Sequence, residues 1–196
     1  MNSNIQIVEK PDWVSWDDIH NTLEKAHERN RNKGIRMRKA TLSGDKIKEE
    51  IGDSGVMFVA LDKDRVVGTA ALVPRTGDSW FNKGPYGYMC FASVLPEYSG
   101  KGIYKGLCEH REGLAKSLGL DKLYIDTHKN NESLIHICLK NGYKKVGLRF
   151  FPDHQNVVLF KWLNGCPYSD FRCWIEYCRR NISFLLKAKV KCLLGR

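Results

Sequence analysis

The sequence predicts an α/β (α+β) fold, in which helices flank a central sheet that is at least partly antiparallel. Two apolar runs, 56–61 and 66–74, are separated only by the polar turn 62–65, which is typical of an antiparallel hairpin. Farther along the chain, strand patterns alternate with helical patterns. The 196 residues suffice for one such domain, and a hydrophobic content of 42% with a charged content of 28% is typical of globular proteins.

The predicted elements contain no internal repeat or low-complexity segment. Ser15, with Asp18 three residues later, forms a capping box at the start of the first helix. The segment 74–85 is rich in Gly and Pro and contains Trp80 and Phe81, so we predict a binding loop there. In chain order the prediction is an irregular or edge-strand start (1–14), a helix from Ser15 to Gly34, an ambiguous stretch (35–42), a short helix from Ser43 or Asp45 to Gly52, the hairpin, the loop, a strand (86–95), a helix to about Leu118, a strand (122–127), a helix (132–140) and a final hairpin (142–163).

Composition excludes several classes of protein. No run of about 18 apolar residues occurs, so no membrane-spanning helix is predicted, and the N-terminus lacks the basic-then-apolar pattern of a signal peptide. The seven cysteines are odd in number and include no C-x-x-C pair, which indicates neither a zinc site nor a disulfide framework. We therefore expect no metal and a cytoplasmic location.

The stretch 94–107 reads V-L-P-E-Y-S-G-K-G-I-Y-K-G-L. An apolar run leads into it and stops at Pro96, Gly100 and Gly102 follow, and a helical pattern starts directly after them. The first turn of a helix carries N–H groups outside the helical ladder at the positive end of the helix dipole, and glycine lets an anion approach them. This glycine turn, defined here as residues 99–104, is therefore predicted to bind a phosphate-bearing ligand.

A second motif lies downstream. The strand pattern Y-I-D-T precedes N-E-S-L-I-H-I-C-L-K-N-G-Y, from Asn131 to Tyr143. Together with the stretch 94–107 and the order of elements, it resembles the GCN5-related N-acetyltransferase (GNAT) superfamily, whose motifs read V-x-P, Q/R-x-x-G-x-G/A and N-x-x-small-x-x-L-Y-x-K-x-G-F. The resemblance covers residues 45–163 well and implies the GNAT fold, a mixed, mostly antiparallel central sheet flanked by helices.

The resemblance implies an acyl-CoA-dependent N-acetyltransferase with acetyl-CoA as co-substrate. Backbone groups of Ala92, Ser93 and Val94 would pair with the pantetheine arm like an extra strand. Asn131 matches the asparagine that contacts the pantetheine region, although a helix N-cap is the alternative role. The backbone N–H groups that would bind the pyrophosphate are those of Ser99, Gly100, Lys101, Gly102, Ile103 and Tyr104.

Three residues depart from the family's pattern. Ser99 replaces the usual Gln or Arg, and Tyr104 stands where Gly or Ala is usual. Cys138 stands where many members have the tyrosine that reprotonates the departing thiolate. A thiol with a pKa of about 8.5 could donate this proton. Alternatively, Cys138 is a small apolar helix residue, and water or the proton of the amine serves instead.

Two residues are candidates for the general base. The resemblance points to Asp126, five residues before Asn131, where some ribosomal-protein alanine acetyltransferases have a glutamate. His128 is indicated independently, because it follows a strand end and titrates near neutral pH, and the alternative is a solvated loop histidine. On the strand before the glycine turn, Tyr88 and Cys90 could line the acceptor site or pack in the core.

The reaction that the resemblance implies is direct transfer. A primary amine attacks the acetyl thioester, strand N–H groups near 92–94 polarise the carbonyl, and coenzyme A leaves as its thiol. Four classes of acceptor are compatible with the sequence: a small amine, an amino sugar, a protein amine and a membrane-linked acceptor. An alternative from a different class is a non-catalytic GNAT-fold module that binds acyl-CoA and acts through its basic tail.

Gly165-Cys166-Pro167 marks a predicted boundary between a domain of residues 1–165 and a tail of residues 166–196. The net charge is +10, and the tail holds seven Lys and Arg against two acidic residues. Its segment 168–194 has the spacing of a basic amphipathic helix. The apolar face could pack on the domain or on a second copy in a homodimer, or attach to an anionic membrane surface, peripherally at the inner membrane face. Nucleic acid is the least supported partner.

Overall fold

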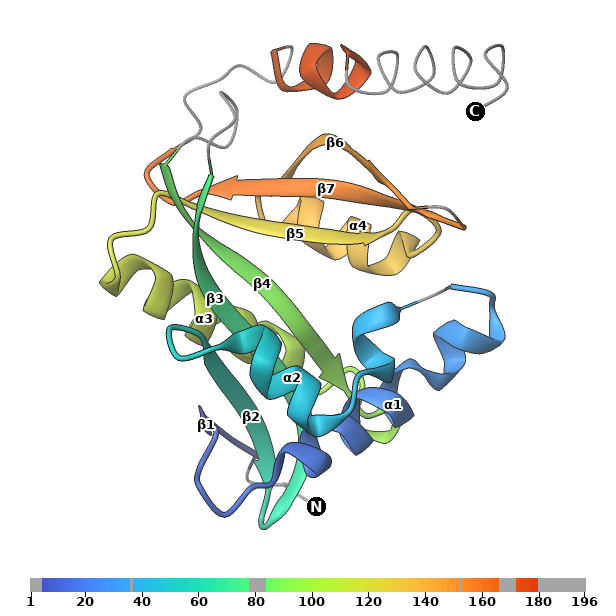
Figure 1. Cartoon of the computed structure of the whole chain (residues 1–196), viewed down its shortest axis with the longest axis vertical. Coiled ribbons are helices and arrows are strands. Elements are labelled where there is room, and N and C mark those ends of the chain that lie inside the picture. The colour runs from blue at the N-terminus through green and yellow to red at the C-terminus, as the bar shows by residue number, and fades with distance from the viewer. Residues whose placement is uncertain (1–4, 36, 78–83, 152, 166–171, 180–196) are drawn as a thin grey trace. The chain divides into compact units, whose positions relative to one another are not determined.

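A computed structural model describes residues 5–35, 37–77, 84–151, 153–165 and 172–179 (Figure 1). The chain divides into two compact units, residues 1–123 and 124–196, which are described separately below. Within the described residues, no helix has both the length and the apolar content needed to cross a membrane.

Unit 1 contains four strands in sequential spatial order, and each neighbouring pair is antiparallel. They are β1 (Ile5–Glu9), β2 (Val56–Asp62), β3 (Arg65–Gly77) and β4 (Gly84–Val94). The predicted first hairpin is confirmed as β2 and β3, and the irregular start contains the edge strand β1.

The predicted loop 74–85 is wrong in extent, because β3 continues to Gly77 and β4 begins at Gly84. Pro74 lies opposite Gly87 and Pro85 lies opposite Thr76. These two pairs lie two positions apart on the ladder and are therefore of the same kind, so both positions that lack an N–H can face away from the partner strand. Trp80 and Phe81 lie outside the described residues, so the binding loop stays a prediction.

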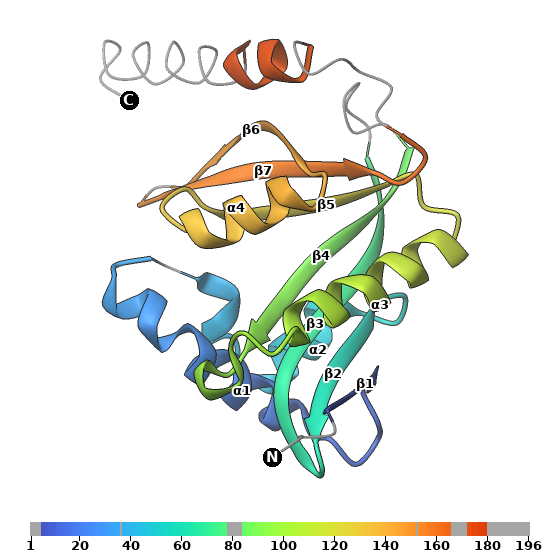
Figure 2. The same ribbon diagram turned by 180° about the vertical axis from the view of Figure 1, so that it is seen from behind.

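The helices of unit 1 cover both faces of its strands. Helix α1 (Trp16–Asn32) and helix α2 (Gly44–Ile51) lie over one face, and α3 (Ile103–Ser117) lies over the other (Figures 1 and 2). The capping box is confirmed, since Ser15 Oγ accepts from the Asp18 N–H at 3.0 Å and Asp18 Oδ2 accepts from the Ser15 N–H at 3.0 Å. The short 3-10 helices are η1 (Arg38–Thr41), inside the ambiguous stretch, and η2 (Pro96–Tyr98).

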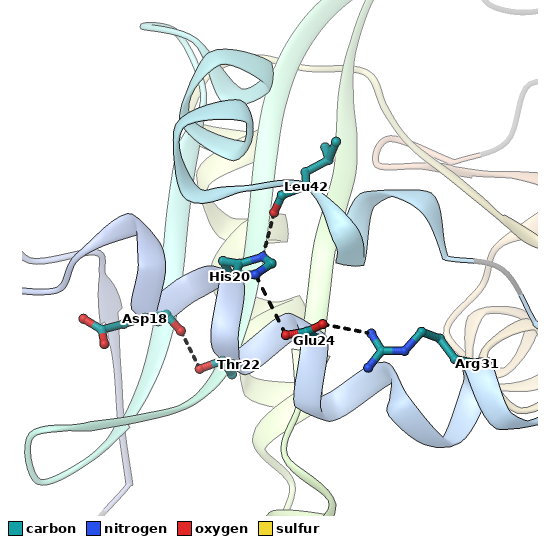
Figure 3. A network of polar contacts seen from close by, with 6 residues as sticks. All are labelled: Asp18, His20, Thr22, Glu24, Arg31 and Leu42. Carbon is teal, nitrogen blue, oxygen red and sulfur yellow. Dashed lines mark hydrogen bonds and ion pairs between the residues drawn. The ribbon is translucent and has the colours of Figure 1, made fainter.

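A polar network on α1 holds the segment that follows η1 (Figure 3). His20 Nδ1 lies 2.7 Å from the carbonyl oxygen of Leu42. Because a carbonyl only accepts, Nδ1 carries the proton. His20 Nε2 faces Glu24 at 3.9 Å, and Glu24 in turn faces Arg31 at 3.9 Å. The segment between α1 and α2 is therefore tied to α1.

The core between α3 and the strands consists of aliphatic side chains and one phenylalanine. Leu107 and Ile103 of α3 pack with residues from β2, β3 and the end of β4. The other members of this cluster are the strand residues Phe58, Ala60, Val67 and Ala70, and Leu95, which directly follows β4. Burial of this apolar surface fixes the start of α3, and so the glycine turn before it, against the strands.

Within the described residues, unit 2 combines three strands with the helix α4 (Glu132–Lys140) and a further helix of residues 172–179. Strands β5 (Lys122–His128, which starts at the end of unit 1), β7 (Gln155–Trp162) and β6 (Lys144–Phe150) follow one another in that spatial order. The predicted hairpin of β6 and β7 is confirmed. Helix α4 packs on β6. The N–H of Lys129, just after β5, donates to the carbonyl of Gln155 at 2.9 Å.

Only part of the predicted tail lies within the described residues. Residues 172–179 form a helix in which Cys173 and Glu176 are buried and Trp174 is exposed. Residues 166–171 and 180–196 lie outside the described part of the chain, so the boundary after residue 165 and the long basic helix stay predictions.

Candidate active site

Strand β4 carries a β-bulge immediately before the predicted pantetheine-binding segment. Thr69 pairs with Ser93 and Ala71 pairs with Cys90, so β4 has one residue more than β3 between these pairs. The backbone strain of the bulge lies at Phe91, whose φ of +52° is one that few non-glycine residues adopt. The Thr69 hydroxyl donates to the Phe91 carbonyl at 2.8 Å and lies 2.8 Å from Ser93 Oγ. Thr69 is 0% exposed, so its buried hydroxyl stabilises the bulge through its contacts with Phe91 and Ser93.

After the bulge, the hydrogen-bond ladder sets which backbone groups are turned outward. The Leu95 N–H donates to the Val67 carbonyl at 2.9 Å, so Leu95 and Ser93 point their backbone groups at β3. In an antiparallel pair the intervening Val94 must then point its N–H and C=O away from β3. This orientation is compatible with the predicted strand-like pairing of residues 92–94 with a pantetheine arm, which stays a prediction.

A histidine that the sequence reading missed contacts this segment. The ring of His27 on α1 hydrogen-bonds to the backbone carbonyl of Ala92, and its Nδ1 lies 3.1 Å from the Asn30 amide nitrogen. Burial lowers the pKa of His27 below 6.5 despite the bond to Ala92. In the neutral ring, Nδ1 accepts from Asn30, so Nε2–H is the donor to Ala92. Its only sequence signal was a histidine four residues after Leu23, on the apolar side of α1.

The pKa of His27 predicts a loss of stability in mild acid. Because the pKa is lower in the folded than in the unfolded chain, the unfolded chain binds the proton first as pH falls below 6.5. The contribution to stability is therefore complete above pH 6.5 and declines below it. We expect the Tm to fall as the pH is lowered below 6.5, and to fall less in His27→Gln. Thermal melts at several pH values check this, and superimposable profiles of the two proteins would contradict it.

The glycine turn adopts the geometry that an anion site requires. Gly100 and Gly102 have φ values of +77° and +78°, and a Cβ atom on either would meet no other atom within 4 Å. The first helical bond of α3 runs from the Gly106 N–H to the Gly102 carbonyl at 3.0 Å, so the N–H groups before Gly106 precede the ladder. The Ser99 N–H instead donates to the Pro96 carbonyl at 3.1 Å. Open space beside a helix N-terminus fits a pyrophosphate.

The charges beside the glycine turn show how the loss of the family's usual Gln or Arg at Ser99 can be offset. Arg65 is neutralised by Glu97 at 2.8 Å. Lys101 is exposed, with its Nζ 4.6 Å from the centroid of the Tyr98 ring, and it has no carboxylate partner among the described residues. Lys101 is therefore a candidate cation for a phosphate at this turn. The Ile103 side chain is 4% exposed and belongs to the core.

In unit 2, Asp126 is held by a residue that the sequence reading missed. Asn156 of β7 donates its amide N–H to Asp126 Oδ2 at 2.7 Å. The other end of this amide, Asn156 Oδ1, is buried and has no hydrogen-bond partner among the described residues. The amide therefore faces Asp126 as a donor, and it fixes the orientation of a half-buried carboxylate. A polar residue at the start of a largely apolar strand pattern was the available signal.

His128 is the last residue of β5 and is 6% exposed, so the alternative of a solvated loop histidine is wrong. Its Nδ1 accepts from the Asn130 N–H at 3.1 Å, and its ring stacks on His154 with centroids 5.6 Å apart. Burial and, next, the charge of His154 lower the pKa of His128 below 6.5. Asp153 lies 2.7 Å from His154 Nδ1. A neutral His128 with Nδ1 occupied carries its proton on Nε2 and presents a donor.

The remaining predicted residues are placed as follows. Asn131 occupies the N-cap position of α4, but its side chain makes no capping bond. Its amide donates instead to Thr127 Oγ1 at 3.1 Å. Cys138 is 2% exposed within α4, which supports its role as a small apolar residue. Tyr88 and Cys90 are each 7% exposed, and burial raises the pKa of the Cys90 thiol to about 11.

Comparisons with solved structures identify the fold. An acetyltransferase of the GNAT family from Staphylococcus aureus is 18% identical, covers 81% of this chain and 99% of its own, and gives a TM-score of 0.64. The ribosomal-protein-S18-alanine N-acetyltransferase from Escherichia coli is 12% identical, with 84% and 97% covered and a TM-score of 0.61. The PaiA N-acetyltransferase from Thermoplasma acidophilum, in complex with coenzyme A, is 20% identical, with 81% and 99% covered and a TM-score of 0.60. No curated protein matches the sequence.

The predicted α/β (α+β) fold with a mixed, mostly antiparallel sheet is thus confirmed as the GNAT fold. Family membership rests on the sequence itself. The sequence model of the acetyltransferase (GNAT) family matches residues 16–143, which include the glycine turn, Asp126 and the motif from Asn131 to Tyr143. The chain therefore belongs to the acetyltransferase (GNAT) family, whose members are acyl-CoA-dependent N-acetyltransferases.

Proposed function

We propose that this protein transfers the acetyl group of acetyl-CoA to a primary amine by direct attack. The observation that carries the proposal is the sequence of a β-bulge at Phe91 and a left-handed glycine turn at Gly100 and Gly102, within one strand–helix segment. Family membership supports acyl-CoA as the donor. A protein of the same fold, PaiA, was crystallised with coenzyme A.

Unit 1 supplies the residues that would hold acetyl-CoA. The N–H groups at the start of α3, from Gly100 onward, would bind the pyrophosphate, with Lys101 as the adjacent cation. The outward backbone groups of Val94 would pair with the amides of the pantetheine arm. Asn131, whose amide donates to Thr127 Oγ1, is proposed to contact the pantetheine region. When bound, acetyl-CoA supplies an acetyl thioester that is activated toward nucleophiles.

Asp126 is the proposed general base. It removes a proton from the ammonium form of the acceptor, directly or through water, and so frees the nitrogen lone pair for attack on the carbonyl carbon. The C–N bond forms, the C–S bond breaks, and the thiolate leaves with a proton from the attacking nitrogen or from water. Asn156 keeps the Asp126 carboxylate in one orientation throughout.

His128 has a different role in this proposal. Because its Nδ1 accepts from the Asn130 N–H, its remaining ring nitrogen carries the proton and donates hydrogen bonds. We therefore assign His128 as a donor near the reacting groups and not as a second base. Cys138 is buried in α4, and the proposal does not require it as an acid.

Two measurements test the proposal. A thermal-shift titration with acetyl-CoA should raise the Tm, by mass action on the folded state. Thiol release from acetyl-CoA, measured with a panel of primary amines, should then show amine-dependent turnover. The absence of any shift at saturating acetyl-CoA would refute acyl-CoA binding. A shift without turnover of any amine would favour the non-catalytic acyl-CoA-binding alternative.

A further inference from the structure

We propose that the acceptor amine also carries an anionic group, a carboxylate or a phosphate, that binds to a cationic cluster in unit 1. The cluster consists of Lys39, Arg75 and the aromatic rings of Tyr88 and Phe91. This inference rests on the proposed amine acetylation and adds the chemical class of the acceptor.

Two cations contact the same tyrosine ring. The Lys39 Nζ lies 4.5 Å from the centroid of the Tyr88 ring and 4.8 Å from that of Phe91. The Arg75 Cζ lies 4.6 Å from the centroid of Tyr88. Cation–π contacts hold the two charged groups in place without neutralising them.

The cluster brings together three segments that are far apart in the sequence. Arg75 of β3 pairs with Tyr86 of β4, which places the Arg75 side chain on the same face as that of Tyr88, two residues on. Lys39 reaches this face from η1. The bond between His20 and the Leu42 carbonyl holds the end of the η1 segment against α1 (Figure 3).

The charges around the cluster do not balance. Lys39 pairs with Glu50 at 2.7 Å, but Arg75 is exposed and has no carboxylate partner among the described residues. Four charged groups influence the pKa of the Cys90 thiol. Three of them are cations, Lys39, Arg111 and Arg75, and only Glu50 is an anion. With a pKa of about 11, this buried thiol stays neutral and adds no negative charge. An anion that approached Arg75 would therefore meet a net positive field.

The position of the cluster sets the shape of the acceptor. Phe91 belongs both to the cluster and to the β-bulge, next to the segment proposed to hold the thioester. Tyr88 is three residues earlier on the same strand, and both rings contact the Lys39 Nζ, at 4.5 Å for Tyr88 and 4.8 Å for Phe91. An amine placed at the bulge would thus have its anionic group several bonds away, beside Arg75. A compact ω-amino acid or an aminoalkyl phosphate has this form.

A set of amines matched in length tests the proposal. Thiol release is measured with 6-aminohexanoate, 4-aminobutyl phosphate and hexylamine, using the wild type, Arg75→Gln and the control Arg38→Gln. Arg38 is exposed and directly precedes Lys39 in η1. Arg38→Gln removes one positive charge, as Arg75→Gln does, but from a residue outside the cluster. We expect the anionic amines to exceed hexylamine in kcat/KM by about tenfold or more, the equivalent of a single charged contact.

Arg75→Gln should remove this preference, mainly through a higher KM for the anionic amines, and should change the kcat/KM of hexylamine much less than theirs. Arg38→Gln should keep the preference. Equal kcat/KM values for charged and neutral amines in the wild type, or a preference that survives Arg75→Gln, would overturn the proposal. The two anionic probes distinguish a carboxylate from a phosphate.

A binding measurement separates this proposal from failure of the proposed function. If acetyl-CoA raises the Tm but no amine is acetylated, the same amines are added to the coenzyme A complex in thermal-shift titrations. A further shift with 6-aminohexanoate or 4-aminobutyl phosphate, lost in Arg75→Gln, would support the anion site even without turnover. The absence of such a shift would refute it.

Discussion

Gly102→Val is expected to abolish the rise in Tm that acetyl-CoA produces in the wild type. At a ligand concentration about 100-fold above Kd, that rise corresponds to about 2.7 kcal/mol of stabilisation. A Cβ on Gly102 meets no protein atom within 4 Å, so the added side chain would enter the open space beside the α3 N-terminus, where the pyrophosphate is proposed to bind. A β-branched residue also disfavours the φ of +78° by about 1–3 kcal/mol.

The control for this prediction is Gly119→Val. Gly119 has a φ of +66° and equally open surroundings, but it follows the C-terminal end of α3, away from the glycine turn. It should lose similar stability because of backbone strain and keep the full acetyl-CoA shift. If Gly102→Val still bound acetyl-CoA with the affinity of Gly119→Val, the glycine turn would not be the pyrophosphate site.

Asp126→Asn is expected to lower kcat by about 10²–10⁴-fold, the usual contribution of a general base. The amide is isosteric with the carboxylate but cannot accept the proton of the amine at neutral pH. It also faces the donor end of the Asn156 amide, which lies 2.7 Å from Asp126 Oδ2 in the native protein. Acetyl-CoA binding should persist, because the proposed contacts of Asp126 are with the acceptor. Thiol-release kinetics and an acetyl-CoA thermal shift measure the two effects separately.

Asp121→Asn provides the matched control, since Asp121 is an exposed carboxylate just before β5. It should retain wild-type kcat. Asn156→Leu should lower kcat less than Asp126→Asn does, because it leaves the base in place but removes the donor that orients it. A wild-type kcat in Asp126→Asn would exclude Asp126 as the general base and would show that another group removes the proton.

Some elements of the site could be predicted from sequence because their signals are local. The glycine turn needs only a strand, two glycines and a helix start within 14 residues, and φ values of +77° and +78° at Gly100 and Gly102 follow from that local pattern. The capping box of Ser15 and Asp18 is equally local. The extent of β3 and β4 was missed, because prolines and glycines suggest a loop unless the register shows that their missing N–H groups are not needed.

The sequence by itself determined the α/β class and the glycine turn, because these depend on periodicity and short motifs, and its resemblance to the GNAT family indicated Asp126 as a candidate base. Only the tertiary structure decided that His27 contacts the Ala92 carbonyl, that Asn156 orients Asp126, and that Lys39 and Arg75 meet on the ring of Tyr88. Each of these contacts joins residues at least 13 positions apart. Pairings of this kind are set by strand register and helix packing, and no local pattern in the chain encodes them.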